Sequence, residues 1–193
     1  MEEFKNKIEE YIALSSEMWD NIVEQSEVLH IKKNETIANY CEVCQSAFFV
    51  LSGSFKISIN LVDGTVKTVW FFLDEVFRMA LCYDSYFLGE PTKYEIKALE
   101  NSTVIKFDAK IVELWTKKYP QLYEFIAKDA LNDFVSSTEI RNHMISHKPM
   151  DFIEYLKEKY PAILLRIPSH HIAHFMGITP EWYSKLKRKI LLS

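Results

Sequence analysis

The sequence predicts an α+β protein in which an N-terminal double-stranded β-helix, or jelly roll, is followed by a long helix and a C-terminal helix-turn-helix. Three observations support this prediction. Short runs of alternating apolar residues fill the first half of the chain, helical spacing returns near residue 109, and the last segment places a glycine between two short helical patterns. We place the boundaries at 1–118 for the roll, 119–146 for the long helix and 147–193 for the C-terminal part.

The composition fits a packed protein with a charged end. Apolar residues make up 48% of the 193 residues, and only 4 glycines and 6 prolines are present, so a linker-rich chain is excluded. The net charge is −4, yet five of the six Lys, Arg, Asp and Glu residues after Leu164 are basic. Such a basic end on an acidic body favours a polyanion as partner of that end.

The N-terminal segment, the lengths of the apolar stretches and the cysteine count indicate where the protein resides. The amphipathic start, MEEFKNKIEEYIAL, lacks the apolar core of a signal peptide, and no stretch reaches the ~18 apolar residues of a membrane span. Three cysteines, an odd number, favour reduced thiols. We therefore expect a cytoplasmic protein that does not bind a membrane.

The first 24 residues predict two short helices. Phe4, Ile8 and Ile12 recur at helical spacing, and Ser15 or Ser16 can cap the second helix.

Residues 28–107 predict the strands of the roll. Phe55, Ile57 and Ile59 alternate with polar residues, and the sequence Val62-Asp63-Gly64-Thr65 is typical of a hairpin turn. Residues 74–91 are irregular, with a short helix. Further strands are expected at Val66–Leu73, Tyr94–Leu99 and Thr103–Phe107.

Helical spacing resumes at Ala109, breaks at Pro120 and continues from about Gln121 to Ser146. This second helix is apolar on more than one side, so it needs more than one packing surface. The second surface is either a second copy of the chain, which we favour, or the interior of the monomer. Met144 extends the apolar stripe of this helix, Phe125, Leu131 and Val135 lie off it, and the predicted dimer contacts are Tyr123, Ile126, Ala127, Ala130 and Phe134. A further helix is expected to begin at Pro149 and to end at Pro161.

The segment from Pro168 to Ile190 has the residue types of a helix-turn-helix at the required offsets. Ala173 is the small residue where the two helices cross, and Gly177, four residues later, suits a left-handed turn. Thr179 can cap the second helix, and Pro180 suits its first turn. Apolar residues that can fill the angle between the helices are Ile172, Met176, Ile178, Tyr183 and Leu186.

The second helix of this motif would expose polar and basic side chains. Short polar groups can contact base edges and basic groups can contact phosphates, which indicates double-stranded DNA as a partner. The alternative is an ordinary pair of helices in a protein-interaction module that does not bind DNA. The predicted DNA contacts are Thr179, Glu181, Trp182, Ser184, Lys185, Lys187 and Arg188.

The run Gly177-Ile178-Thr179-Pro180-Glu181, the basic stretch after Ser184 and the strand-turn at Phe48–Gly53 resemble the CRP/FNR family of bacterial transcription regulators, and within it a branch common in Bacteroidetes. The resemblance covers nearly the whole chain. It implies a cyclic-nucleotide-binding-like roll, a dimerisation helix and a second motif helix that docks in the major groove. It also implies a homodimer, with DNA and RNA polymerase as partners.

The resemblance assigns roles residue by residue. Glu181 stands where the family accepts a hydrogen bond from a cytosine amino group. Lys185 and Pro180 replace arginines of the best-known members, so we expect a different target sequence. The wing that usually follows the recognition helix is expected to be missing, because the sequence ends at Ser193.

The family's nucleotide cassette is degenerate here. Its Gly-Glu pair falls at Cys82-Tyr83 and its Arg-Ser pair at Thr92-Lys93, while the pair Gly89-Glu90 lies too close to the next strand to serve. Cyclic AMP is therefore not expected to bind. An alternative is a regulator that senses another small anion, since positive charge remains near the cassette. The residues of this degenerate pocket are Arg78, Cys82, Tyr83, Thr92 and Lys93.

No catalytic, cofactor or metal site is predicted. Cys41 and Cys44 form a single C-x-x-C without the further ligands of a zinc site. A redox switch, in which the two thiols form a disulfide, is the alternative interpretation. His170 and His174 have metal-pair spacing but no third ligand nearby. A metal-dependent barrel enzyme needs histidines inside the barrel, and none occurs between His30 and His143.

Overall fold

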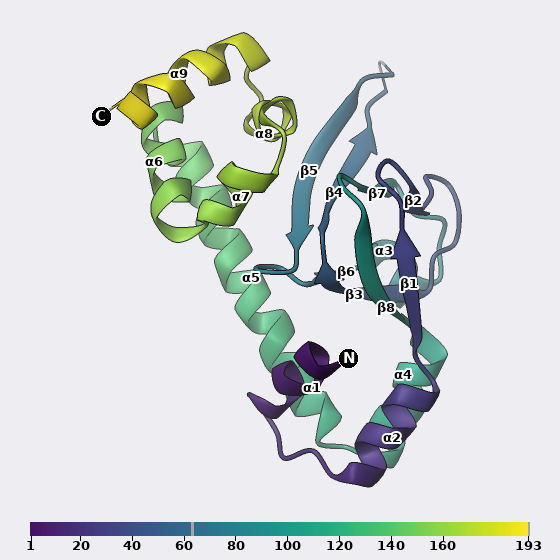
Figure 1. The fold of residues 1–193 in the computed structure, drawn as a ribbon. Helices are drawn as coiled ribbons and strands as arrows, with labels where there is room; N and C mark the ends of the chain where they lie inside the picture. The colour runs from purple at the N-terminus through teal and green to yellow at the C-terminus, as the bar shows by residue number, and fades with distance from the viewer. Residues whose placement is uncertain (63, 193) are drawn as a thin grey trace.

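The structure is a computed structural model that describes residues 1–62 and 64–192. It is an α+β fold, as predicted: a roll of two antiparallel sheets, a long helix running along one side, and a group of helices at the C-terminal end, which we call the head (Figure 1). The head comprises α6 (Pro149–Lys159), α7 (Pro161–Arg166), α8 (Ser169–Met176) and α9 (Pro180–Leu192).

The two sheets of the roll have the orders β1-β8-β3-β6 and β2-β7-β4-β5, and all strand pairs are antiparallel. The first sheet is built from β1 (Glu27–Ile31), β3 (Ser46–Ser52), β6 (Met79–Ala80) and β8 (Ser102–Asp108), the second from β2 (Thr36–Ala38), β4 (Ser54–Asn60), β5 (Val66–Leu73) and β7 (Tyr94–Ala98).

The predicted hairpin joins β4 to β5. Asn60 pairs with Val66, and the Leu61 N–H donates to the Thr65 carbonyl at 2.8 Å. Asp63, part of the predicted turn signal, lies outside the described residues. β5 has the predicted bounds, and the short helix expected between 74 and 91 is α3 (Tyr83–Leu88).

The strand β3 is buried on both faces, which divides the core of the roll in two. Phe48 and Val50 point between the sheets, whereas Phe49 points outward. Outside the first sheet, Phe49 meets Phe4 of α1 (Glu2–Glu9) at 4.7 Å between ring centroids. This second core is completed by α2 (Ser16–Glu24), α4 (Ala109–Lys118) and the start of α5 (Leu122–Ser146). Ser15 caps α2, as predicted, by accepting from the Met18 N–H at 3.2 Å.

The helices after residue 108 match the sequence prediction with one addition. Pro120 separates α4 from α5, and Pro149 begins α6. Pro161 follows the end of α6, as expected, but it also opens α7, which the sequence analysis did not predict. Proline suits this place because the first turn of a helix needs no N–H donor. Among the described residues, no helix is both long and apolar enough to cross a membrane.

Candidate nucleic-acid interface and ligand cavity

The helices α8 and α9 are joined by a three-residue turn built on Gly177. Gly177 has φ +68°, and its N–H and that of Ile178 donate back to carbonyls at the end of α8. A Cβ at Gly177 would meet no atom within 4 Å, so glycine is needed here for its backbone conformation and not for space. Ala173 is fully buried where the helices cross, as predicted.

The second helix, α9, starts as predicted and presents two different faces. Thr179 Oγ1 accepts from the Trp182 N–H at 3.2 Å, and Pro180 occupies the first turn. Tyr183 and Ile190 point toward the interior of the head and are buried. Burial raises the pKa of Tyr183 to about 12. The opposite face, at i, i+3, i+4 and i+7 spacing, is exposed and carries Glu181, Ser184, Lys185 and Arg188.

Two of the predicted DNA contacts have different surroundings. Trp182 flanks the exposed face and is 47% exposed. Lys187 lies toward the head, half-buried, and its Nζ donates to the Leu164 carbonyl at 3.0 Å. Lys187 therefore tethers α9 to α7, whereas Lys185, Arg188 and Lys189 form no ion pair within the described residues.

The head rests on the roll through an aromatic contact. Phe175 of α8 lies edge-on to Trp70 and Phe71 of β5, at 5.8 and 5.6 Å between centroids. His171 lies on the same helix. Burial lowers the pKa of His171 to about 4, and the charges of Lys56, His170 and His174 act in the same direction. His171 is therefore neutral at physiological pH and compatible with this partly buried position.

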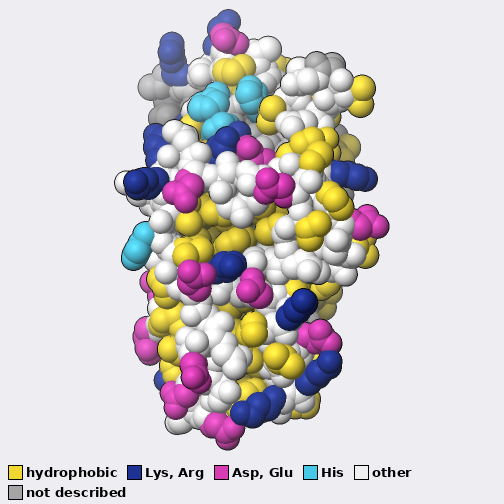
Figure 2. Space-filling model, turned by 90° about the vertical axis from the view of Figure 1, so that its right-hand side faces the viewer, with side chains coloured by type: hydrophobic (Ala, Val, Ile, Leu, Met, Phe, Trp, Pro, Cys, Tyr) yellow, Lys and Arg dark blue, Asp and Glu magenta, His cyan; other side chains and the backbone are white. Residues whose placement is uncertain are grey.

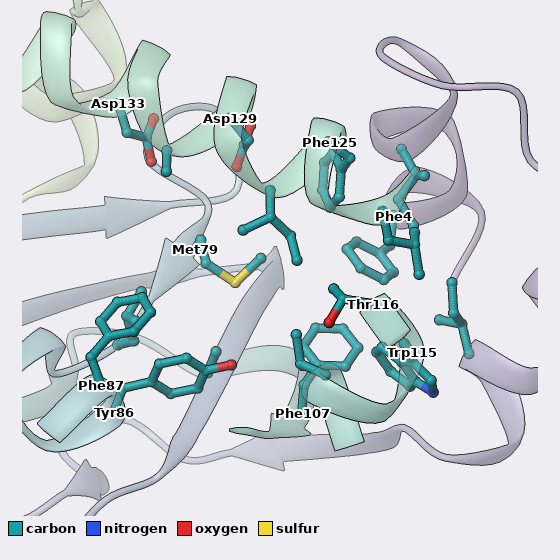
Figure 3. Close-up of a pocket in the computed structure, with 18 of the residues that line it drawn as sticks. Phe4, Met79, Tyr86, Phe87, Phe107, Trp115, Thr116, Phe125, Asp129 and Asp133 are labelled. Atoms are coloured by element: carbon teal, nitrogen blue, oxygen red, sulfur yellow. The ribbon is translucent and has the colours of Figure 1, made fainter. Parts of the chain in front are cut away.

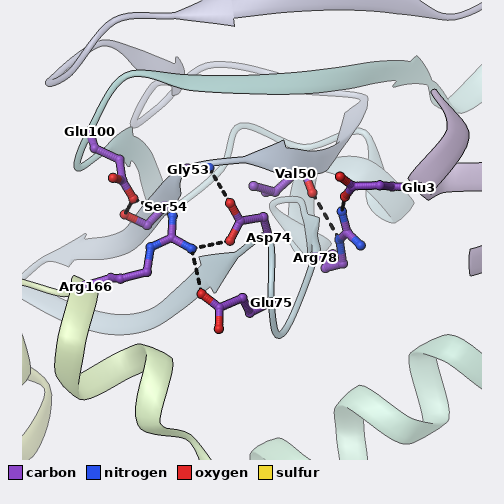
Figure 4. A network of polar contacts seen from close by, with 9 residues as sticks. All are labelled: Glu3, Val50, Gly53, Ser54, Asp74, Glu75, Arg78, Glu100 and Arg166. Atoms are coloured by element: carbon purple, nitrogen blue, oxygen red, sulfur yellow. Dashed lines mark hydrogen bonds and ion pairs between the residues drawn. The ribbon is translucent and has the colours of Figure 1, made fainter.

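A charged cluster, the Arg166 clamp, holds the same junction (Figure 4). The Arg166 guanidinium, at the end of α7, pairs with Asp74, with Glu75 at 3.1 Å and with Glu100 at 2.7 Å. These acids come from two loops at one end of the roll. Sequence analysis did not single out Arg166, because its partners lie 66 to 92 residues away.

The acids of the clamp are themselves fixed by the roll. Asp74 accepts from the Gly53 N–H at 2.8 Å, and Glu100 accepts from the Ser54 hydroxyl at 2.7 Å. Gly53 has φ +105°, and a Cβ there would lie 2.0 Å from Ser102 Oγ, so only glycine fits. The clamp thus connects α7 to three turns of the roll, which follow β3, β5 and β7.

A large cavity of about 810 Å³ lies between the roll, α5 and α8. Its volume is within the range of small-molecule sites, and its walls mix apolar and polar groups. Phe175 lines it as well, so this cavity also reaches the contact between head and roll. The polar and charged residues that line it are Lys67, Thr68, Tyr83, Asp84, Tyr94, Asp133, Ser137 and Arg141.

Asp84 occupies the donors that the degenerate cassette would offer to an anion. Its carboxylate accepts from the Thr92 hydroxyl at 2.9 Å, the Lys93 N–H at 3.0 Å and the Ser85 N–H at 2.9 Å. Partial burial opposes ionisation of Asp84, but these hydrogen bonds outweigh it and lower its pKa below the usual value. The sequence signal that could have found Asp84 is an acid at the first turn of the short helix beside the cassette.

Among the other cassette positions, only Tyr83 lines the large cavity. Cys82 is fully buried, and burial raises its pKa to about 11. Lys93 is exposed. Arg78 packs 4.5 Å from the centre of the Phe49 ring, donates to the Val50 carbonyl and pairs with Glu3. It is therefore committed to the outer core and does not face the cavity.

The remaining candidate ligands do not form a metal site among the described residues. In the view of Figure 2, histidine side chains gather at the head end of the molecule, and acidic and basic side chains are mixed over the roll. The ring centroids of His170 and His174 are 6.2 Å apart. No group of three or more His, Cys, Asp or Glu residues in the described ranges could hold a metal ion, and the cysteines there are free thiols.

One face of α5 is apolar and exposed, and two of its residues, Ala130 and Phe134, also lie at the large cavity. Ala127 and Ala130 are exposed there, Tyr123 and Phe134 are 63% and 64% exposed, and their spacing of four, three and four residues forms one stripe. Ile126, the fifth predicted dimer contact, is half-buried against the second core, and Met144 is packed in the main core. Phe125 is buried on the opposite side, so α5 has two apolar surfaces, one inside the chain and one outside.

Comparisons with known proteins agree with this architecture. Residues 28–118 match the family model described as the cyclic nucleotide-binding domain. A search of curated proteins finds no match.

Solved structures match over most of the chain. FixK2 from Bradyrhizobium japonicum has a TM-score of 0.72 at 14% identity, covering 86% of this chain and 85% of that one. The c-di-GMP responsive regulator CLP from Xanthomonas campestris has 0.69 at 10%, covering 92% of each. A putative CRP/FNR-family regulator from Eubacterium rectale has 0.68 at 18%, covering 93% and 84%. Residues 28–118 thus match the cyclic nucleotide-binding domain family, and most of the chain has the fold of these solved regulators.

Proposed function

We propose that this protein is a DNA-binding transcription regulator, not an enzyme, and that α9 is the helix that enters the major groove. The observation that carries this proposal is the exposed face of α9, which presents Glu181, Ser184, Lys185 and Arg188 while the opposite face is buried. The position of α9 at the outer end of the head, away from the roll, supports it (Figure 1).

The chemistry of each group assigns its role. Glu181 and Ser184 near the start of α9 are short and directional, so they suit contacts to base edges. Lys185 and Arg188 suit phosphates, and Lys185 also reaches toward guanine. Thr179 caps the helix, and Lys187 fixes it to α7, so both act by positioning α9.

The protein acts as a homodimer in this proposal, with RNA polymerase as a further partner. In such a dimer, the α5 stripe of one copy would pack against the same stripe of the second copy. The residues of this stripe are Tyr123, Ala127, Ala130 and Phe134. The two α9 helices would then contact half-sites about 34 Å apart. Residues 1–118, 119–146 and 147–193 would then be the sensing, dimerisation and DNA-binding parts.

The DNA test begins with selection of an operator from random duplexes by the full chain. Truncating Glu181 or Ser184 to alanine is expected to cost roughly 1–3 kcal/mol and to relax preference at one base pair. Combining Lys185→Ala with Arg188→Ala should weaken binding to every sequence alike.

Lys110→Ala, on α4, serves as the matched control because Lys110 is an exposed lysine far from the head. If no sequence is enriched, and the double variant binds random DNA as the wild type does, the interaction-module alternative replaces this proposal.

We also infer that cyclic AMP and cyclic GMP do not regulate this protein. Asp84 already accepts the hydrogen bonds at Thr92 and Lys93, and its negative charge repels a cyclic phosphate. Calorimetric titration should show no binding of either nucleotide at micromolar concentrations. Saturable micromolar binding would overturn the inference; a ligand of other chemistry in the large cavity would not.

A further inference from the structure

A smaller cavity, of about 130 Å³, lies on the outer side of the first sheet and shares only Tyr83 with the cassette positions (Figure 3). Residues of α1, α2, α3, α4 and α5 line it over β3, β6 and β8, and two of the aromatic residues, Tyr83 and Phe87, are more than half exposed. Its walls are almost entirely apolar and rich in aromatic rings. The aromatic residues that line it are Phe4, Tyr83, Tyr86, Phe87, Phe107, Trp115 and Phe125.

The size of the cavity matches one aromatic ring. An engineered apolar cavity of about 150 Å³ stays dry and binds benzene. Here the walls are held by ring–ring contacts: Phe107 lies 4.9 Å from Phe4 and 5.7 Å from Trp115 between centroids. The space is therefore bounded by side chains that fix one another, which favours a preformed site.

One end of the cavity is acidic. Asp129 and Asp133, one turn apart on α5, both line it and point toward it in Figure 3. Lys7 of α1 pairs with Asp129 at 3.4 Å, whereas no described residue donates a hydrogen bond to Asp133 or pairs with it. Burial, followed by the charge of Asp129, raises the pKa of Asp133 to about 7, although Lys7 opposes this. The end of the cavity thus lacks one cation.

We propose that this cavity binds a small aromatic amine, with the ring among the aromatic side chains and the ammonium group donating to the Asp133 carboxylate. The ligand's cation supplies the charge partner that the chain does not provide, and a partly buried carboxylate gains from such a partner because it has lost part of its water. The rings of Tyr86 and Phe87 offer further attraction for a cation at this end. An aromatic carboxylate is repelled by the two acids.

Three probes of equal ring size test the proposal on the full chain at pH 8: benzylamine, benzyl alcohol and phenylacetate, measured by calorimetry or ligand-observed NMR. Benzylamine is expected to bind roughly tenfold more tightly than benzyl alcohol, and phenylacetate not at all. Asp133→Asn should reduce benzylamine to the level of benzyl alcohol, and lowering the pH below 7 should do the same in the wild type. Asp20→Asn, at an exposed carboxylate on α2, is the matched control and should change neither affinity.

A second variant locates the binding. Val112→Phe places a ring into the cavity wall on α4, and it should abolish binding of both benzylamine and benzyl alcohol while thermal unfolding stays cooperative. Equal affinity for all three probes, no binding at millimolar concentration, or binding that survives Val112→Phe would each overturn the proposal. Neither Asp133 nor Val112 belongs to α9, so DNA binding by these variants shows separately whether the regulator proposal holds.

Discussion

Asp84 and Asp133 show how the same side chain acquires opposite properties from its neighbours. Asp84 receives three hydrogen bonds, and its pKa is lowered; Asp133 receives none from the described residues and lies near Asp129, and its pKa rises to about 7. The residue pattern at Cys82, Thr92 and Lys93 predicts that the nucleotide cassette is degenerate. It could not reveal Asp84, since hydrogen bonding between a helix start and a later turn depends on the folded chain.

Asp133 makes stability depend on pH. Its pKa is about 7 in the folded chain and about 3.8 when exposed, so the folded state holds the extra proton and wild-type stability falls as pH rises from about 4 to 7. The titratable groups that face it are Asp129, Lys7 and the phenol of Tyr83, which is neutral in this pH range. Asp133→Asn should remove this dependence and raise the unfolding free energy at pH 8 by about 2 kcal/mol.

Chemical denaturation of both proteins at pH 5 and pH 8 measures the effect. The unfolding free energy of the variant should exceed that of the wild type at pH 8 and differ little from it at pH 5. An equal change at both pH values would mean that the carboxylate is ionised and solvated in both states.

At the scale of elements, the sequence was sufficient to predict a helix, strand or turn where a residue pattern repeats or where the backbone conformation requires one residue type. The bounds of β5, the break at Pro120 and the turn at Gly177 were predicted because alternation, proline and left-handed backbone are local properties. α7 was missed because six residues give too short a helical pattern. Ile126 could not be separated from Tyr123 and Phe134 from the sequence, because only the packing of α5 against the second core shows which side is covered.

The exposed stripe of α5 gives the prediction at this scale. Phe134→Glu places a charge where a second copy would bury an aromatic ring, so the dimer dissociation constant should rise at least about tenfold. Sedimentation velocity over a concentration series measures it. Leu165→Glu is the control, since Leu165 is an exposed apolar residue on α7 and should leave the dimer intact. A wild-type chain that sediments as a monomer at all concentrations would refute dimerisation through α5.

In the whole molecule, roll and head form one continuous packed unit. Apolar residues of both belong to the same core cluster, and the Arg166 clamp adds charge contacts at the edge of the junction. The order of the three parts was predictable from the sequence. Their junction was not, because Asp74, Glu75 and Glu100 meet Arg166 only after the two loops that carry them have folded.

Arg166→Gln should weaken this junction. The variant leaves Asp74, Glu75 and Glu100 without their cation, and the unfolding free energy should fall by roughly 1–3 kcal/mol. Hydrogen exchange should accelerate in α7 and α8 before it does in the roll. Arg141→Gln is the matched control, because Arg141 forms no ion pair within the described residues. Unchanged exchange in α7 and α8 would show that the aromatic contact of Phe175 alone holds the head.

The clamp has a consequence for how this protein would respond to ionic strength. Counterion release from DNA alone gives a straight line when the logarithm of affinity is plotted against the logarithm of salt concentration. The Arg166 cluster lies partly in solvent and is screened over the same range, with a Debye length of about 10 Å at 0.1 M. Added salt therefore has two effects. It weakens the phosphate contacts of α9, and it weakens the ion pairs of Arg166 that join the head to the roll. The plot for the wild type should bend, and that for Arg166→Gln should be straight.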